Sequence, residues 1–324
     1  MIDFRYHLVS IVSIFLALAV GIVLGAGPLQ GEIGATLQDE VAGLRDDKTQ
    51  LNEQLDAAQA GTEARDGYIA AANPRVLAGA LGSRAVAVVV LPGAAALTES
   101  TVASLEAAGG RVSSTTTVAE DWVATNEATT TTRDAVVTRV ATAAGVDLAD
   151  TSDLAPRDAL LASLLARSDA DPSVAALDPA EARQGQPALA EAGRVTVDLP
   201  DGAYERAALV VVLSAAVTQG EQDTWEGTAG AWVDLGVAFA GRSGGTLLAA
   251  ATSSGDGVSV VATLRADGAA AAEVSTVDDA DDPMGQASIV HGLVGQADGT
   301  VGQYGLGPGA EAPFAPVPTS APSR

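Results

Sequence analysis

Cysteine is absent from this chain of 324 residues, and histidine and methionine occur only twice each. A protein without cysteine forms no disulfide bond and has no thiolate to act as a nucleophile or metal ligand. Soft metal ions are usually held by sulfur or imidazole groups, which are scarce here. These absences remove several classes of enzyme and metal site, and they predict no resident cofactor.

Basic residues are also few, with 17 Lys and Arg against 41 Asp and Glu and a formal net charge of −24. A surface this acidic repels phosphate backbones, so we expect no nucleic-acid partner. The aromatic residues, Trp 3, Tyr 4 and Phe 4, are too few for the two aromatic girdles of a membrane-spanning β-barrel. The composition therefore predicts neither a nucleic-acid-binding protein nor a barrel pore.

Sequence motifs of catalysis are missing as well. No expected strand is followed by GxGxxG or by a GxSxG elbow, because the GRSGG of residues 241–245 comes before an expected strand, and the chain has no GxxxxGK[ST] or HExxH segment. His7 stands next to an apolar run, and His291 lies on an expected helix, where a histidine usually packs without a chemical role. We therefore expect no catalytic residue and a protein that is not an enzyme.

An apolar run near the N-terminus is the clearest feature that is present. Residues 8–26 carry no charge, and as a helix they would span roughly 28 Å, close to the thickness of a bilayer core. Arg5 precedes this run and only acids follow it until Arg45, so the positive-inside rule predicts a short cytoplasmic N-terminus and an extracytoplasmic C-terminal body. We expect residues 1–28 to be a single-pass signal anchor in the cell membrane or envelope; a cleaved signal peptide is the alternative.

Small residues recur at every fourth position of this run, at Ser13, Ala17, Gly21 and Gly25. On a helix they form one shallow face that a second transmembrane helix can approach closely. The alternative is that alanine and glycine are simply frequent in this chain.

A heptad pattern follows the Gly27-Pro28 break and fills residues 29–73. Apolar residues alternate in steps of four and three, at Leu37, Val41, Leu44, Leu51, Leu55, Ala58 and Ile69, with Lys48, Thr62 and Arg65 at the remaining positions. This pattern is typical of a coiled coil, so we expect a homodimer joined along the seam. A lone amphipathic helix that packs on the body is the alternative.

The body, residues 74–304, has the pattern of an α/β domain. Residues 85–91 and 207–213 are unbroken apolar runs, which favour strands buried on both faces of a mostly parallel sheet covered by helices. Residues 98–108 predict the helix of a βαβ unit. A short turn between expected strands 246–252 and 258–264 predicts an antiparallel hairpin at the sheet edge. Residues 305–324 hold five prolines among small residues and predict a disordered tail.

Four aspartates, Asp278, Asp279, Asp281 and Asp282, follow the last long expected strand, 272–277. Ligands of open α/β sheets usually bind at this end of the strands, and four carboxylates there could hold a hard cation such as calcium. The alternative is a solvated turn in which Asp282 caps the helix that begins at Pro283.

The opening segment MIDFRYHLVSIVSIFLALAVGIVLGAGPL, the heptads, the α/β body and the late segment STVDDADDPMGQ together resemble the mycobacterial copper transport protein B (MctB) family of actinobacteria. The resemblance covers nearly the whole chain. It implies an envelope protein of copper transport or homeostasis, with copper as the metal concerned. The alternative that the family implies is a SteB-like septal protein, which with a SteA-like envelope partner regulates peptidoglycan hydrolysis and cell separation. The residues themselves favour a coiled-coil scaffold that presents an α/β domain.

Overall fold

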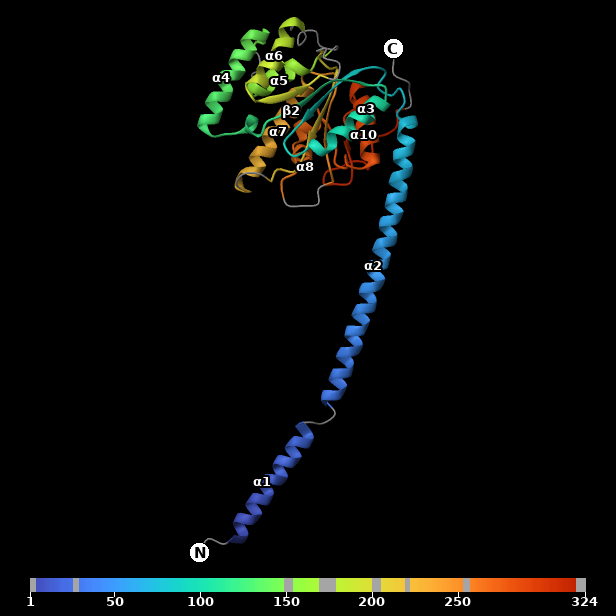
Figure 1. Ribbon diagram of the computed structural model, residues 1–324, viewed down its shortest axis with the longest axis vertical. Coiled ribbons are helices and arrows are strands. Elements are labelled where there is room, and N and C mark those ends of the chain that lie inside the picture. Colours follow the sequence, from blue (N-terminus) through green and yellow to red (C-terminus); the bar gives the residue numbers. More distant parts are fainter. Residues whose placement is uncertain are drawn as a thin grey trace. The chain divides into compact units, whose positions relative to one another are not determined.

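The computed structural model describes residues 4–25, 29–148, 154–168, 179–199, 205–218, 222–252 and 257–318 (Figure 1). The chain divides into two compact units, Met1–Arg65 and Asp66–Arg324. We describe each unit by itself.

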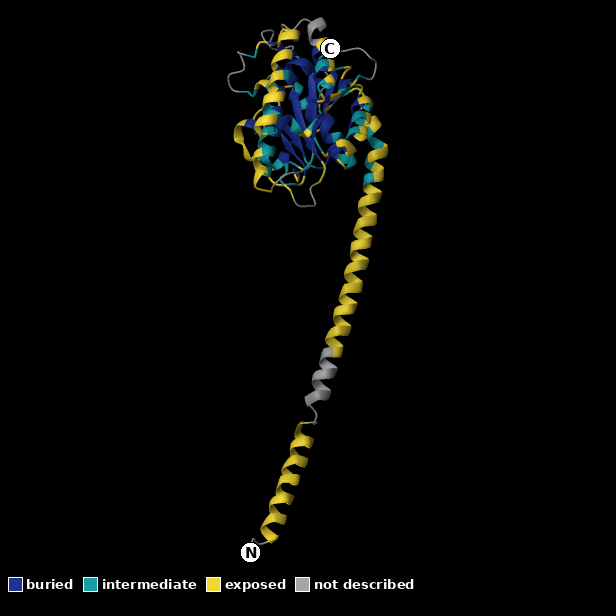
Figure 2. Ribbon diagram, turned by 60° about the vertical axis from the view of Figure 1, so that its left-hand side comes forward, coloured by how far each residue is buried: buried dark blue, intermediate teal, exposed yellow. Residues whose placement is uncertain are grey.

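The first unit is built from two helices, α1 (Phe4–Gly25) and most of α2 (Leu29–Val76). Every described residue of α1 is exposed, as Figure 2 shows, and the helix is 22 residues long, or about 33 Å. It is the one described helix that is long and apolar enough to cross a membrane. The Gly27-Pro28 break that the sequence predicts falls in residues 26–28, which lie outside the described residues.

Helix α2 continues three residues past the boundary that the sequence predicts at residue 73. Pro74 lies inside its last turn, and the Leu77 N–H still donates a hydrogen bond to the Asn73 carbonyl (2.8 Å). The Asn73 side chain also donates to the Pro283 carbonyl (2.7 Å). The final turns of α2 therefore belong to the body, because residues from Asp66 onward cluster with it.

The body is organised around one seven-stranded sheet with the order β3-β2-β1-β4-β5-β6-β7. All neighbouring pairs are parallel except β2 with β3, which forms an antiparallel edge. The strands are β1 (Ala85–Val90), β2 (Arg111–Val118), β3 (Val195–Asp198), β4 (Leu209–Ser214), β5 (Thr246–Ala250), β6 (Ser275–Val277) and β7 (Gln303–Tyr304). The predicted fold class, a mostly parallel sheet with an antiparallel edge, is confirmed.

Strands β1 and β4 form the centre of the sheet, with Val86 opposite Leu209 and Val90 opposite Leu213. Every residue of both strands is buried, because helices cover both faces (Figure 2). Continuous apolar runs are typical of such doubly covered strands. The two runs that the sequence singles out thus become the core of the domain.

Helices cover the two faces unequally (Figure 1). One face packs against α3 and α10, and the other against the remaining helices of the body. These helices are α3 (Thr98–Ala107), α4 (Glu127–Ala144), α5 (Pro156–Leu165), α6 (Pro179–Glu191), α7 (Trp225–Ala240), α8 (Val260–Ala266), α9 (Gly268–Ala271) and α10 (Pro283–Ala297). Three short 3-10 turns join them to the strands, η1 (Ala95–Leu97), η2 (Glu120–Val123) and η4 (Gln222–Thr224).

One predicted strand is wrong. Residues 258–264 do not return as the second strand of a hairpin; they begin α8, and the antiparallel edge is formed by β3 instead. The Ser259 hydroxyl accepts a hydrogen bond from the Ala262 N–H (3.2 Å) and so caps the helix. A short apolar run fits a strand or a buried helix equally well, and the serine cap decides for the helix here.

The predicted disorder of residues 305–324 is wrong for residues 305–318, which follow the body in a defined course. Arg265 holds this segment: its guanidinium donates to the carbonyls of Tyr304 (2.6 Å) and Pro308 (3.2 Å). Asp278 accepts from the N–H groups of Leu306 (2.8 Å) and Gly307 (2.9 Å). A proline-rich composition opposes helix and sheet, but these side-chain bonds satisfy the backbone without either. Residues 319–324 lie outside the described residues.

Candidate functional site

Strands β1 and β4 are neighbours at the point where the strand order reverses. From β1 the chain continues outward to β2, and from β4 it continues outward to β5 on the opposite side. In open α/β sheets this switch point leaves a crevice at the carboxyl ends of the strands, where ligands bind. A pocket of about 950 Å³ lies there, within the size range of small-molecule sites. We call it the switch-point pocket. Its walls are the segments 91–93, 123–126 and 215–218 that follow β1, β2 and β4, with residues near the first turns of α4, α5, α7 and α8.

Arg133 on α4 forms part of the pocket wall and is 4% exposed. Its terminal nitrogen donates to the carbonyls of Trp122 (2.9 Å) and Ala124 (2.9 Å). Its Nε donates to the Asp134 carboxylate (3.1 Å). Arg133 thus ties η2 to α4 while its cationic group remains at the wall.

Arg157 reaches the same pocket from the first turn of α5, which begins at Pro156. Its Nε lies 3.4 Å from the Asp158 Oδ1, yet this buried Nε makes no hydrogen bond. The Asp158 Oδ1 accepts from the Trp122 indole (2.8 Å), and its Oδ2 has no hydrogen-bond partner. Burial raises the pKa of Asp158 to about 6, although attraction to Arg157 opposes this.

The remaining walls are apolar or carry neutral polar groups. Leu91, Val123, Val217, Trp232 and Val260 provide the larger apolar surfaces, and the hydroxyls come from Thr125, Thr130, Thr218, Thr224 and Thr228. Glu120 and Asp223 also line the pocket and are exposed. The arrangement can therefore hold a partly apolar ligand with several hydrogen-bonding groups.

The acidic turn, Asp278–Asp282, lies at the carboxyl end of β6, as the sequence predicts. Two of its four aspartates are engaged in structural bonds. Asp278 pairs with Arg265 and accepts the two tail N–H groups, and Asp281 accepts from the Thr252 N–H (2.7 Å). Their oxygens therefore join the turn to neighbouring segments.

The other two aspartates of the turn differ from each other. Asp279 is 1% exposed, and neither carboxylate oxygen has a hydrogen-bond partner. Burial, together with repulsion by Asp278, raises its pKa to about 6. Asp282 stands at the N-cap position of α10 without making a side-chain cap bond, and burial and Asp281 raise its pKa.

Metal-ligating side chains do not converge in the part of the chain that the structure describes. No group of three or more His, Cys, Asp or Glu residues there could hold a metal ion, and this includes the acidic turn. His291 lies in α10, is 5% exposed, and burial lowers its pKa. Burial therefore disfavours the charged imidazolium form, and the side chain is almost inaccessible from the surface.

The heptad seam of α2 is exposed along its length. The exposed fractions are 44% for Val41, 66% for Leu44, 64% for Leu51 and 56% for Leu55. Ala58 is exposed too, whereas Ile69 is partly covered and belongs to the body. The side chain of Leu37 lies outside the described residues. These apolar residues recur along one face of α2, with Lys48 between Leu44 and Leu51, and they differ from scattered surface leucines only in their regular spacing.

The small-residue face of α1 is likewise uncovered. Ser13, Ala17, Gly21 and Gly25 are all exposed, and a Cβ added at Gly21 or Gly25 would meet no atom within 4 Å. The Ser13 hydroxyl donates to the Val9 carbonyl of its own helix (2.8 Å). A second helix could therefore approach this face closely.

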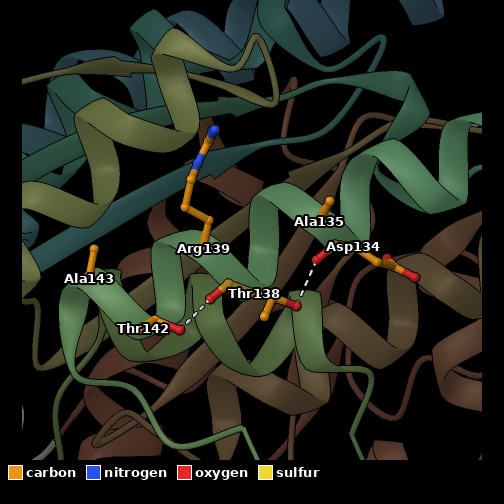
Figure 3. Close-up of a pocket in the computed structure, with 6 residues that line it drawn as sticks. All are labelled: Asp134, Ala135, Thr138, Arg139, Thr142 and Ala143. Carbon is orange, nitrogen blue, oxygen red and sulfur yellow. Dashed lines mark hydrogen bonds between the residues drawn. The ribbon is translucent and has the colours of Figure 1, made fainter.

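A second hollow, of about 650 Å³, is lined by one face of α4 alone. Figure 3 shows its six residues, including Asp134, Thr138 and Thr142, along that helix. The Thr138 and Thr142 hydroxyls donate to carbonyls one turn earlier in α4 (2.8 Å each). Because the two hydroxyls are engaged within the helix and no second element contributes to the lining, this hollow carries no argument for a binding site.

Sequence reasoning missed the switch-point pocket. It placed ligands at the carboxyl edge of the sheet but chose the acidic turn after β6. The apolar strands at 85–91 and 207–213 were a usable signal, since a reversal of strand order between them puts the crevice beside their ends. Nothing in the sequence pattern indicated that Arg133 and Arg157 meet there.

The two units define a class of protein: an α/β domain of doubly wound type that carries an N-terminal helix of membrane-spanning length. Comparison with known proteins then gives the family. Residues 1–315 match the family described as "Copper transport outer membrane protein, MctB". Proteins named "Copper transporter MctB" are 32% identical over 315 residues in Mycobacterium tuberculosis (strain ATCC 25618 / H37Rv) and 31% identical over 321 residues in Mycobacterium leprae (strain TN). Each alignment covers 96% of this chain and 98% of the relative. The chain belongs to this family.

Proposed function

We propose that this protein serves copper transport or homeostasis in the cell envelope as a non-enzymatic, membrane-anchored scaffold. The copper assignment rests on the family and its named relatives. The scaffold assignment rests on one observation: the apolar seam of α2 is exposed in the single chain. In a parallel dimer, each seam residue would be buried by its counterpart on the second copy.

The proposed topology places the short N-terminus in the cytoplasm, α1 across the membrane, and the body outside. The positive-inside argument from Arg5 supports this orientation. Anchoring both copies in one membrane would force their stalks to run parallel. The exposed small-residue face of α1 would add a second contact between the same two chains.

The proposal assigns copper handling to an assembly and not to a copper site within this chain. Sulfur and imidazole ligands are too few, and the His291 imidazole is buried. The scarcity of copper ligands also favours a second candidate function. In it, the body docks on an envelope partner like SteA and regulates cell separation. The two candidates share the dimeric stalk and differ in the cellular process.

A complementation experiment separates these possibilities. Cells that lack the protein receive either the full-length wild type or the seam variant Leu44→Asp, Leu51→Asp, Leu55→Asp. A matched control carries Gln50→Asp, Ala57→Asp and Ala60→Asp, which add the same charge at exposed positions outside the seam. Cell copper, septation and the membrane level of each variant are measured under copper load.

We expect cells without the protein to have altered copper content that the wild type and the control variant restore. The seam variant should reach the membrane in normal amount and yet fail to restore it. Full restoration by the seam variant would contradict the scaffold. Unchanged copper content with a separation defect would replace the copper role by the septal one.

A further inference from the structure

We propose that the switch-point pocket binds a small organic anion whose charged group lies against Arg157 and Arg133. This inference goes beyond the scaffold function and depends on neither copper nor the stalk. It rests on a cavity, a pair of cationic side chains and an unused hydrogen-bond donor, which come from different elements of the body.

The cavity is large enough for a metabolite and lies where this fold binds ligands. Its volume of about 950 Å³ exceeds the need of an inorganic ion, and it opens beside the ends of β1 and β4. Residues near the first turns of α4, α5 and α7 also line it. The positive ends of these helix dipoles add to a potential that favours an anion.

The charges at the inner wall do not balance. Arg133 and Arg157 both attract Asp158, which is the fully buried carboxylate beside them. The Asp134 carboxylate that pairs with Arg133 is 59% exposed and is therefore largely screened by water. Asp234, which also acts on Asp158, is exposed in the same way. Two guanidinium groups thus share one buried carboxylate, while the other nearby carboxylates are screened by water, so a further buried negative charge would be favoured there.

Arg157 supplies an unused donor in this cluster. Its Nε is buried and makes no hydrogen bond, and its side chain is 17% exposed. Because Arg157 lines the pocket with a partly exposed side chain, a charged acceptor on a ligand would form a bond about twice as strong as a neutral one. A carboxylate or phosphate oxygen is the matching acceptor for a guanidinium.

The outer part of the pocket indicates which chemical groups the uncharged part of the ligand carries. Trp232 and Val260 offer apolar surface, and the threonine hydroxyls can bond to hydroxyl, amide or ring nitrogen groups. Glu120 and Asp223 are exposed and would repel a ligand that is anionic along its whole length. The pocket therefore fits a molecule with one anionic end and a polar, partly apolar remainder.

Binding is tested on the full-length chain in detergent, with uridine diphosphate, citrate and orthophosphate as anionic probes and uridine as the uncharged counterpart. Calorimetric titration gives affinity, and intrinsic fluorescence reports the surroundings of the three tryptophans, of which Trp232 lines the pocket. We expect at least one organic anion to bind saturably, with at least tenfold preference over uridine. Orthophosphate as the best binder would contradict the organic part of the proposal.

Two pairs of variants locate the site. Arg157→Gln should weaken binding by about 10- to 100-fold, the loss of one charge-assisted hydrogen bond, whereas Arg139→Gln on the exposed face of α4 should change it less than twofold. Gly227→Phe places a ring at the pocket wall, where a Cβ meets no atom within 4 Å. Its control is Gly230→Phe, which has the same free space on α7 but does not line the pocket.

We expect Gly227→Phe to abolish binding without lowering the melting temperature, and Gly230→Phe to bind as the wild type does. The glycine pair keeps the test valid if Arg157→Gln does not fold. The proposal is overturned if no organic anion binds at millimolar concentration, or if Gly227→Phe binds as tightly as Gly230→Phe.

Discussion

The central strands and the stalk use the same apolar residues in opposite ways. In β1 and β4, valine and leucine are fully buried because helices cover both faces of the sheet. On α2, leucines of the seam keep more than half of their surface exposed. The body therefore completes its own core within one chain, whereas the described apolar residues of the stalk remain exposed. On the proposed function, a second copy would cover them.

The largest expected effect comes from an aspartate placed in the sheet. Val211→Asp buries a charge at a position with no exposed surface, so it should cost at least about 4 kcal/mol and prevent folding of the body. Leu51→Asp introduces the same side chain on the stalk, where the body should keep its melting temperature. Calorimetric melting of both full-length variants checks this contrast. Equal destabilisation by the two would show that stalk and body share one core.

The next effect concerns the C-terminal segment. Arg265→Gln removes the donors to Tyr304 and Pro308 and leaves Asp278 without its ion partner, so we expect a loss of about 2–4 kcal/mol. Hydrogen exchange should rise selectively in residues 305–318. Arg139→Gln, at an exposed position, is the control and should leave exchange unchanged. Protection that survives in the Arg265→Gln variant would show that other contacts order this segment.

A smaller effect should appear as pH dependence. Asp279 has a pKa of about 6 in the folded chain and 3.8 as its ordinary value, so the folded state binds more protons between these values. The contribution of Asp279 to the free energy of unfolding should therefore fall as pH rises from about 4 to 6 and level off above. Asp279→Asn should raise stability at pH 7.5 by about 1–2 kcal/mol and reduce this slope. In the variant, Asp158 and Asp282, whose pKa values are also raised, should still lower the free energy of unfolding as pH rises, and His291, whose pKa is lowered, should oppose them.

Denaturation curves of the wild type and the Asp279→Asn variant at pH 4, 5, 6 and 7.5 measure this difference. Asp298→Asn is the matched control, because Asp298 is exposed and lies outside the acidic turn. A variant that is less stable than the wild type at pH 7.5 would mean that the Asp279 carboxylate is stabilised in its charged form.

The sequence allowed the sheet to be predicted where the segments next to an apolar run also agreed with a strand. The unbroken run at 85–91 fits a strand covered on both faces, and the Gly109-Gly110 pair ends the helix before β2. Residues 258–264 misled because an apolar run of this length fits either element until Ser259 caps it. The order of residues 305–318 depends on Arg265 and Asp278, which are distant in sequence. For the same reason, the approach of Arg133 to Arg157 follows only from the folded arrangement.

Disulfide trapping in native membranes tests the dimeric stalk most directly, because a chain without cysteine gives no background. Leu51→Cys places a thiol on the seam, and Glu53→Cys places one on the opposite side of α2. Mild oxidation of the full-length chain should convert most of the Leu51→Cys variant to a covalent dimer and little of the Glu53→Cys variant. Equal trapping of the two, or a Leu51→Cys variant that remains monomeric, would contradict the account.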